Sequence, residues 1–282
     1  MDKYEITELL QTRLDMCESN SFSMLGHEDE RMWEKPLVGF ASGNDPLFQF
    51  FKEDIGEFYM TPQEVFRTKY ADADAENLTV ISLAFSHTSI TKKEQALQAD
   101  EQCLRWMLSR NTWKTFSGEL YAHINNALSE QGIRFVIPDL MPEMKPALSE
   151  KYGRAFAWSQ RHTAFVCGLG TFGLSKGLIT RQGVAMRFAS IAADIKIEPD
   201  KREYEGYRDW CLFGKDGSCG ACIKRCPSGA ITKERHDKEK CRAYLDKMNE
   251  KNIKNPLLDP SIEVGCGLCQ SAVPCADKCP VQ

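Results

Sequence analysis

Residues 211–231 read CLFGKDGSCGACIKRCPSGAI and open a tail, residues 211–282, that holds nine of the twelve cysteines. Within this stretch the spacing C-x2-C-x3-C-P is typical of iron–sulfur proteins, because a tight loop wraps three thiolates around one cubane while the cysteine before the proline turns toward a second cluster. Five more cysteines follow the stretch. The tail is therefore predicted to bind two four-iron clusters. The cysteines that follow are Cys241, Cys266, Cys269, Cys275 and Cys279.

Two cubanes need eight thiolates, and the interleaved ferredoxin pattern divides the tail cysteines into two sets. Seven residues separate Cys211 from Cys219, where two are usual. The closing ligand of the first set is Cys275 or Cys279, and Cys275 is preferred because Cys279 lies close to an end that tends to fray. The first set is Cys211, Cys219, Cys222 and Cys275, and the second is Cys226, Cys241, Cys266 and Cys269.

Disulfides and zinc are the competing interpretations of these cysteines. A disulfide-stapled secreted module would follow a signal peptide, and none is found ahead of a cysteine-poor first part of the chain. Zinc takes isolated C-x2-C pairs and does not account for the third cysteine before Pro227. The remaining cysteines, Cys17, Cys103 and Cys167, are expected to be small buried hydrophobic residues.

Composition limits the classes of protein that fit. The chain has 282 residues, of which 42% are hydrophobic and 27% charged, as in a soluble globular protein, and no apolar run reaches the length of a membrane span. The net charge is −4. No concentrated basic run of the kind found in nucleic-acid binders is present, so the charge pattern does not support tRNA binding. We expect a cytoplasmic location, where thiols stay reduced, and no membrane partner.

The rest of the chain alternates between helical and strand patterns. Residues 78–86, LTVISLAFS, are a continuous apolar run that predicts a buried central strand. IRFVIP at 133–138 predicts a second buried strand, and Gly132 stands where a helix C-cap glycine belongs. This alternation predicts a mixed α/β layer architecture. The other predicted elements are helices over 4–16, 92–108 and 116–130, a helix that starts within 45–51, a strand over 37–41 and a loop over 139–144.

Residues 158–180, WSQRHTAFVCGLGTFGLSKGLIT, contain three glycines in the order G-x-G-x-x-G. RHTAFVC resembles the end of a helix, and strand-like runs come after the glycines, which is the wrong order for a dinucleotide-binding loop. The glycines either let the backbone lie flat against a large planar ligand or form a crowded turn. His162, beside Arg161, is either a ligand or acid, or a structural histidine.

These residues together resemble a known family. GLGTFGLSKGLIT, a following strand that ends in Asp194, and the two-cluster pattern with CPSGAI and DKEKCRAYL are similar to the epoxyqueuosine reductases and, more remotely, the reductive dehalogenases. The resemblance implies an α/β (α+β) nitroreductase-like domain over residues 1–200 and a ferredoxin-like two-[4Fe-4S] module over 201–282. It also implies a cobalamin site. Its cofactor-binding residues would be Arg161, Gly168, Gly170, Thr171, Phe172, Gly173 and Ser175.

The resemblance implies a reductase, but the chain departs from the family at the proton donor. The family places an Asp seven positions before the arginine, and here that position is Arg154. Candidate proton donors are therefore His162, Tyr152 and Asp139. Three functions follow: cobalamin-dependent reduction of a small or nucleoside-like substrate, corrin-free electron transfer to a partner such as a corrinoid enzyme, and epoxyqueuosine reduction on tRNA. Each needs an electron donor such as ferredoxin or flavodoxin.

Overall fold

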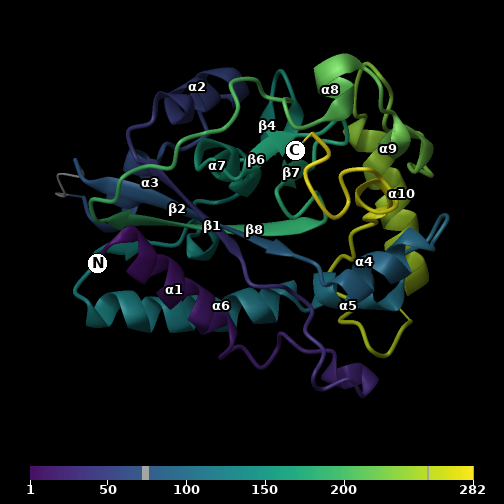
Figure 1. Cartoon of the computed structure of the whole chain (residues 1–282), viewed down its shortest axis with the longest axis horizontal. Helices are drawn as coiled ribbons and strands as arrows, with labels where there is room; N and C mark the ends of the chain where they lie inside the picture. Colours follow the sequence, from purple (N-terminus) through teal and green to yellow (C-terminus); the bar gives the residue numbers. More distant parts are fainter. Residues whose placement is uncertain (72–75, 253, 282) are drawn as a thin grey trace.

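The computed structural model describes residues 1–71, 76–252 and 254–281, and its centre is a four-stranded sheet (Figure 1). All three strand pairs are antiparallel, and the register of the two longest strands places Ile81 opposite Ile191. Two short hairpins lie outside the sheet. The sheet order is β1 (Leu37–Ser42), β2 (Leu78–Ser86), β8 (Met186–Asp194) and β3 (Phe135–Val136), and the hairpins are β4 (Pro146–Ser149) with β5 (Gly153–Phe156) and β6 (Gly170–Phe172) with β7 (Leu178–Thr180).

Strand β2 is buried along its whole length, because both faces of the sheet are covered. Its side chains alternate between two cores, with Val80 in one and Ile81 in the other. This arrangement confirms the predicted buried central strand and the mixed α/β layers. The expected strand over 37–41 and the expected helix over 116–130 are also present, and Gly132 follows that helix with a φ of +68°.

Helices cover the two faces of the sheet as separate layers (Figure 1). One layer lies below the sheet in the view and packs its apolar side chains into the core that contains Ile81. The other layer shares its core with the cysteine tail. The first layer contains α1 (Lys3–Leu14), α5 (Leu104–Asn111) and α6 (Trp113–Glu130), and the second contains α2 (Pro46–Ile55), α3 (Pro62–Lys69) and α7 (Gln160–Val166).

Two predicted elements differ in the structure. The helix expected over 92–108 is broken into α4 (Ser89–Ala96) and α5, because the intervening segment turns to meet the tail, where Arg225 Nη1 donates to the Gln98 carbonyl at 2.7 Å. Of the strand expected over 133–138, only β3 (Phe135–Val136) forms. The loop expected over 139–144 begins within a 3-10 turn, Pro138–Leu140.

The tail lies beside the β6–β7 hairpin and the α4–α5 pair (Figure 1). Its helices are short, apart from one that carries Cys241. Gly183, which follows β7, is approached so closely by the Ala276 backbone that a Cβ would overlap it. The tail and the sheet layers therefore pack directly on each other. The tail elements are α8 (Leu212–Asp216), α9 (Ala221–Lys224), α10 (Lys238–Asn252) and a 3-10 turn at Leu268–Gln270.

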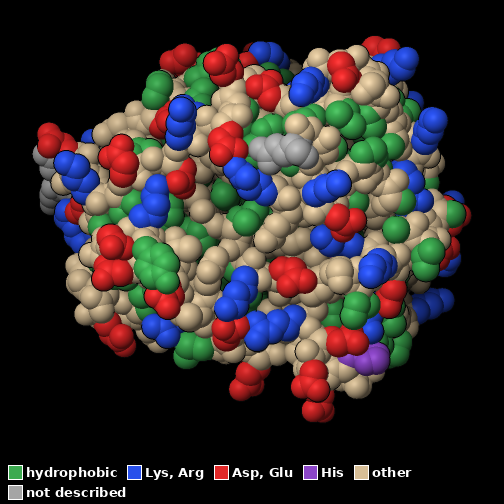
Figure 2. All heavy atoms as spheres, in the orientation of Figure 1, with side chains coloured by type: hydrophobic (Ala, Val, Ile, Leu, Met, Phe, Trp, Pro, Cys, Tyr) green, Lys and Arg blue, Asp and Glu red, His purple; other side chains and the backbone are tan. Residues whose placement is uncertain are grey.

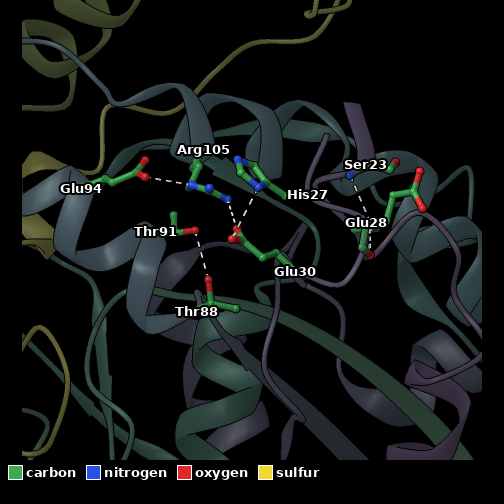
Figure 3. A network of polar contacts seen from close by, with 9 residues as sticks. Ser23, His27, Glu28, Glu30, Thr88, Thr91, Glu94 and Arg105 are labelled. Carbon is green, nitrogen blue, oxygen red and sulfur yellow. Dashed lines mark hydrogen bonds and ion pairs between the residues drawn. The ribbon is translucent and has the colours of Figure 1, made fainter. Parts of the chain in front are cut away.

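The α4–α5 pair is held in place by the buried side chain of Arg105 (Figure 3). Its Nε donates to Glu94 of α4 at 2.9 Å, and its Nη1 pairs with Glu30 of the loop before β1. The guanidinium also lies over the Phe22 ring, 4.8 Å from the centroid. Arg105 thus joins three segments that are distant in sequence, next to the surface on which the tail packs.

The face of the molecule drawn in Figure 2 shows no dominant charge. On the face drawn in Figure 2, the described acidic and basic side chains are interspersed. None of the described helices is both long and apolar enough to cross a membrane.

Candidate functional site

The first thiol set, Cys211, Cys219, Cys222 and Cys275, lines a single cavity that is partly open to solvent. Burial raises the pKa of Cys275 to about 12, and the nearby charges of Cys211, Cys222 and Cys219 add to this effect. Iron bound between these sulfurs would offset the negative charge of their thiolates. Gly173 and Ser175 line the same cavity.

Helix α8 explains the unusual spacing of Cys211 and Cys219. Cys211 is the N-cap of this helix, and Gly217 ends it with a φ of +74°. The intervening residues thus form one compact helical turn that returns the chain, so that both thiols face the same cavity. The extra length seen in the sequence does not separate the two sulfurs.

The second thiol set is Cys226, Cys241, Cys266 and Cys269. Burial raises the pKa of Cys269, and the largest charge contributions come from Cys266 and Cys241, followed by Cys222 and Cys226. Because Cys222 belongs to the first set, the two sets lie within electrostatic range of each other. This proximity suits electron transfer between two clusters.

Cys226 has a special environment within the second set. Burial acts to raise its pKa, but hydrogen bonds from Ser228 and from the backbone N–H groups of Ile231, Ala230 and Ser228 outweigh burial and lower it. The Ser228 hydroxyl lies 3.3 Å from the sulfur. Hydrogen bonds to a sulfur stabilise the thiolate, which is the form that binds metal.

All twelve cysteines are unpaired thiols, and the described residues contain no group of three or more His, Cys, Asp or Glu arranged around a single metal ion. In a cubane each thiolate ligates a different iron, so four sulfurs need not converge on one point. As expected, Cys17, Cys103 and Cys167 are buried. Cys279 is buried as well, and it is Cys275 that lines the cavity of the first set.

The glycine segment serves mainly to build the β6–β7 hairpin. Gly168 follows α7 with a φ of +77°, and a Cβ on Gly170 would overlap the Ile179 carbonyl. Thr171 is buried and accepts a hydrogen bond from the Trp210 N–H at 2.9 Å, while Phe172 packs in the core. The crowded-turn interpretation accounts for these four residues. Their cofactor roles stay predictions, and of the predicted residues it is Gly173 and Ser175 that face the first thiol set.

Arg161 lies within electrostatic range of Cys269 in the second thiol set, on a surface that we call the Arg161 surface and define by Arg161, Lys176, Tyr207 and Lys238. Arg161 Nη1 donates to the Lys176 carbonyl at 2.7 Å. Although the Arg161 side chain is exposed, the surrounding protein desolvates its guanidinium and lowers its pKa, against the opposing charges of Tyr207 and Cys269. An accessible but poorly solvated cation is suited to binding a ligand.

The Arg161 surface carries cations without carboxylate partners. In the part of the chain that the structure describes, Arg161, Lys176 and Lys238 form no ion pair. Lys238 Nζ instead donates to the carbonyls of Tyr152 and Arg154, at 2.8 and 2.7 Å. Burial lowers the pKa of Lys176, and the charges of Arg208 and Lys238 lower it further. Unbalanced positive charge of this kind favours an anionic ligand.

His162 is half-buried behind the Arg161 surface. Its Nδ1 lies 2.7 Å from Ser159 Oγ and its Nε2 lies 2.9 Å from the Tyr207 hydroxyl. Burial lowers the pKa of His162 to about 3, and Arg161 contributes in the same direction. The imidazole is therefore neutral at pH 7 and acts as a hydrogen-bonding group.

The side chains of the other two predicted proton donors, Tyr152 and Asp139, are engaged in hydrogen bonds. The Tyr152 hydroxyl donates to Asp54 at 2.7 Å, and Asp54 also pairs with Lys151. Asp139 accepts from Tyr121 at 2.6 Å and from Gln160 at 2.7 Å. Their catalytic roles stay predictions. The sequence analysis did not single out Tyr207, Lys176 or Lys238, because none of them belongs to a spaced pattern.

Comparison with solved structures places this geometry in a known class of fold. A structure of epoxyqueuosine reductase with an epoxyqueuosine-modified tRNA stem loop aligns with a TM-score of 0.52 at 17% identity, over 97% of this chain and 66% of that chain. The mixed α/β fold described above is thus shared with epoxyqueuosine reductase. A catabolic reductive dehalogenase aligns at a TM-score of 0.48, over 87% of this chain and 30% of that chain, which is too low to argue a common fold.

Sequence comparison identifies a relative of the same kind. Over 151 residues the chain is 30% identical to an epoxyqueuosine reductase from Leadbetterella byssophila, and the alignment covers 50% of this chain and 47% of that protein. The chain thus spans about half the length of the curated relative it matches. No family model matches it. These comparisons confirm the predicted resemblance to the epoxyqueuosine reductases.

Proposed function

We propose that the protein is an iron–sulfur reductase that passes electrons through two [4Fe-4S] clusters to cobalamin beside the Arg161 surface, for reduction of a small or nucleoside-like organic substrate. The observation that carries this proposal is the shared cavity in which the first thiol set faces Gly173 and Ser175. Electrons that leave the clusters emerge next to the glycine segment and Arg161.

The thiols fit the proposed clusters in number and arrangement. Each set supplies four unpaired sulfurs, and the charge of Cys222 reaches Cys269 in the other set. Iron–sulfur clusters have reduction potentials that reach about −700 mV at the low end of their range. Electrons would come from a one-electron donor of the ferredoxin or flavodoxin class. The proposed division into a cofactor domain, residues 1–200, and a cluster module, residues 201–282, places the two sets in the second part.

Cobalamin fits the same region through its polar groups. Arg161 and Lys238 are accessible cations without carboxylate partners among the described residues, and they would bind the phosphate or amide oxygens of such a cofactor. When bound, cobalamin supplies a strongly reducing metal centre. The protein's own side chains then position the substrate and provide its proton.

Cobalamin binding is tested by titrating the anaerobically reconstituted protein with cobalamin and recording the visible spectrum. We expect binding at micromolar concentrations with a shift to the base-off form. The Cys222→Ala variant should still bind cobalamin, but it should no longer pass electrons from the donor to the cofactor. Absence of binding at these concentrations would refute the cobalamin site and favour corrin-free electron transfer to a partner enzyme.

A second candidate is epoxyqueuosine reduction on tRNA. It is favoured by the unpaired cations Arg161, Lys176 and Lys238, which would suit a phosphate, and by the tRNA stem loop in the structure of a protein with the same fold. An epoxyqueuosine-modified stem loop and the free epoxyqueuosine nucleoside serve as the two substrates. Turnover of the stem loop alone would establish this candidate, and turnover of the free nucleoside would support the first.

A further inference from the structure

Tyr207 holds its hydroxyl group in a fixed place on the Arg161 surface. Its ring stacks on Phe172 with the centroids 4.3 Å apart and the planes inclined by 11°. Its carbonyl accepts a hydrogen bond from the Phe172 N–H at 2.9 Å. Backbone and ring are thus both attached to strand β6, while 38% of the residue remains exposed. A partly exposed side chain with little freedom is well placed to meet a ligand.

The contacts of Ser159 with His162 favour one position for the hydrogen on the imidazole ring. Ser159 is the N-cap of α7, and its Oγ accepts the backbone N–H of His162 at 3.4 Å. The Ser159 hydroxyl hydrogen is therefore free to point at Nδ1, which lies 2.7 Å away. In a neutral imidazole the hydrogen is then on Nε2.

This tautomer sets the direction of the next hydrogen bond. In this tautomer the Nε2–H group of His162 donates to the Tyr207 oxygen, which lies 2.9 Å away. The Tyr207 hydroxyl hydrogen is then left without an acceptor, since the described residues offer no other partner for this group. With the opposite tautomer, Tyr207 would donate to Nε2 and would have no hydrogen to offer.

We propose that Tyr207 is the proton donor to the substrate bound on the Arg161 surface, with His162 and Ser159 as positioning residues that keep its hydroxyl hydrogen free. This inference rests on the proposed reductase function and adds to it the source of the proton. It also accounts for the absence of the family's Asp, whose position is Arg154 here. The candidates Tyr152 and Asp139 are engaged in hydrogen bonds of their own.

The proposed step balances as follows. Two electrons, supplied one at a time by a donor of the ferredoxin or flavodoxin class, would reach the substrate through the clusters held by the two thiol sets and the proposed cobalamin. The Tyr207 O–H bond breaks, its proton bonds to the atom made basic by reduction, and a phenolate remains. Burial raises the pKa of Tyr207 and disfavours this phenolate, whereas the charge of Arg161 and the Nε2–H group of His162 favour it. A solvent proton restores the hydroxyl after the product leaves, and solvent supplies any second proton that the substrate needs.

The tautomer is tested first, because its measurement needs no substrate. Nitrogen-15 NMR of the histidine side chains in the cluster-loaded protein should show His162 as a neutral Nε2–H tautomer at pH 7, assigned by the signal that is lost in His162→Gln. A neutral Nδ1–H tautomer, or a protonated ring, would overturn the proposal whatever the substrate is.

The catalytic role is tested with Tyr207→Phe and with Tyr4→Phe as the control, using the epoxyqueuosine nucleoside as substrate; Tyr4 is an exposed tyrosine on helix α1, away from the Arg161 surface. We expect Tyr207→Phe to lose about 100-fold in kcat with KM nearly unchanged, and Tyr4→Phe to retain full activity. His162→Leu should lose activity that His162→Gln partly restores, since a Gln amide nitrogen can donate to Tyr207.

The outcomes separate this inference from the proposed function. Full activity in Tyr207→Phe would overturn the role of Tyr207 while leaving the reductase function intact. Failure of the wild-type protein to reduce the nucleoside, together with the Nε2–H tautomer, would reject this substrate and support the arrangement of Tyr207. Failure of the wild-type protein to reduce the nucleoside, together with the Nδ1–H tautomer, would reject both this substrate and the role of Tyr207.

Discussion

Gly267, between Cys266 and Cys269, is the position where the second thiol set meets the sheet layers most tightly. Its φ is +67°, and a Cβ there would overlap the indole of Trp106. Trp106 is only 4% exposed and stacks on His87 with the ring centroids 4.0 Å apart, so it cannot swing away. Replacing Gly267 with Ala should therefore weaken the attachment of the tail to helix α5.

The expected loss in the free energy of unfolding for Gly267→Ala has two parts. A residue with a Cβ in the left-handed region costs about 1–2 kcal/mol, and overpacking against a buried ring costs about 1–3 kcal/mol, for a sum of about 2–5 kcal/mol. Gly217 provides the matched control, because its φ is +74° but no atom lies within 4 Å of its Cβ position. Gly217→Ala should lose only the first part.

The assay is anaerobic urea denaturation followed by tryptophan fluorescence and by the visible absorbance of the clusters. We expect Gly267→Ala to be less stable than Gly217→Ala by about 1–3 kcal/mol and to lose cluster absorbance at a lower urea concentration than the wild type. Equal stability of the two variants would refute the tight packing of Gly267 on Trp106.

Three further predictions concern the ligands, pH and the Arg105 contacts. Because Cys275 lines the cavity of the first thiol set, Cys275→Ser should lose about one to four irons per chain by metal analysis, and Cys279→Ser should lose none. Loss of iron in Cys279→Ser alone would identify Cys279 as the ligand instead. Burial lowers the pKa of His87 to about 3, whereas the pKa is about 6.5 in the unfolded chain. The free energy of unfolding should therefore be greatest above pH 6.5 and fall by about 1.4 kcal/mol per pH unit toward pH 4. Urea denaturation at a series of pH values should show this slope for the wild type and not for His87→Asn. Arg105→Met should cost about 1–2 kcal/mol, because Glu30 and Glu94 are partly exposed, and exposed Arg242→Met should cost less in the same assay.

The elements that the sequence predicts well are those whose pattern is local. The run at 78–86 is apolar throughout because both faces of β2 are covered, and the helix over 116–130 ends before a glycine in the left-handed region. The break at 97–103 could not be predicted in the same way. It depends on a contact with Arg225, which is more than a hundred residues away.

The candidate site shows the same division. Cysteine spacing predicted the two thiol sets, because the geometry of a cubane constrains the loop that wraps it. The spacing does not reveal that the seven residues between Cys211 and Cys219 fold into helix α8. Tyr207 gave no signal, since its importance depends on a hydrogen bond to His162, 45 residues earlier. A pattern search finds ligands for metals more readily than single proton donors.

Iron and sulfide analysis of anaerobically purified protein tests the central claim most directly. Two cubanes held by the two thiol sets predict about eight irons and eight sulfides per chain, with a visible spectrum that bleaches on reduction. Far fewer irons, or zinc bound to these thiols instead, would contradict the electron-transfer account and the reductase function that depends on it.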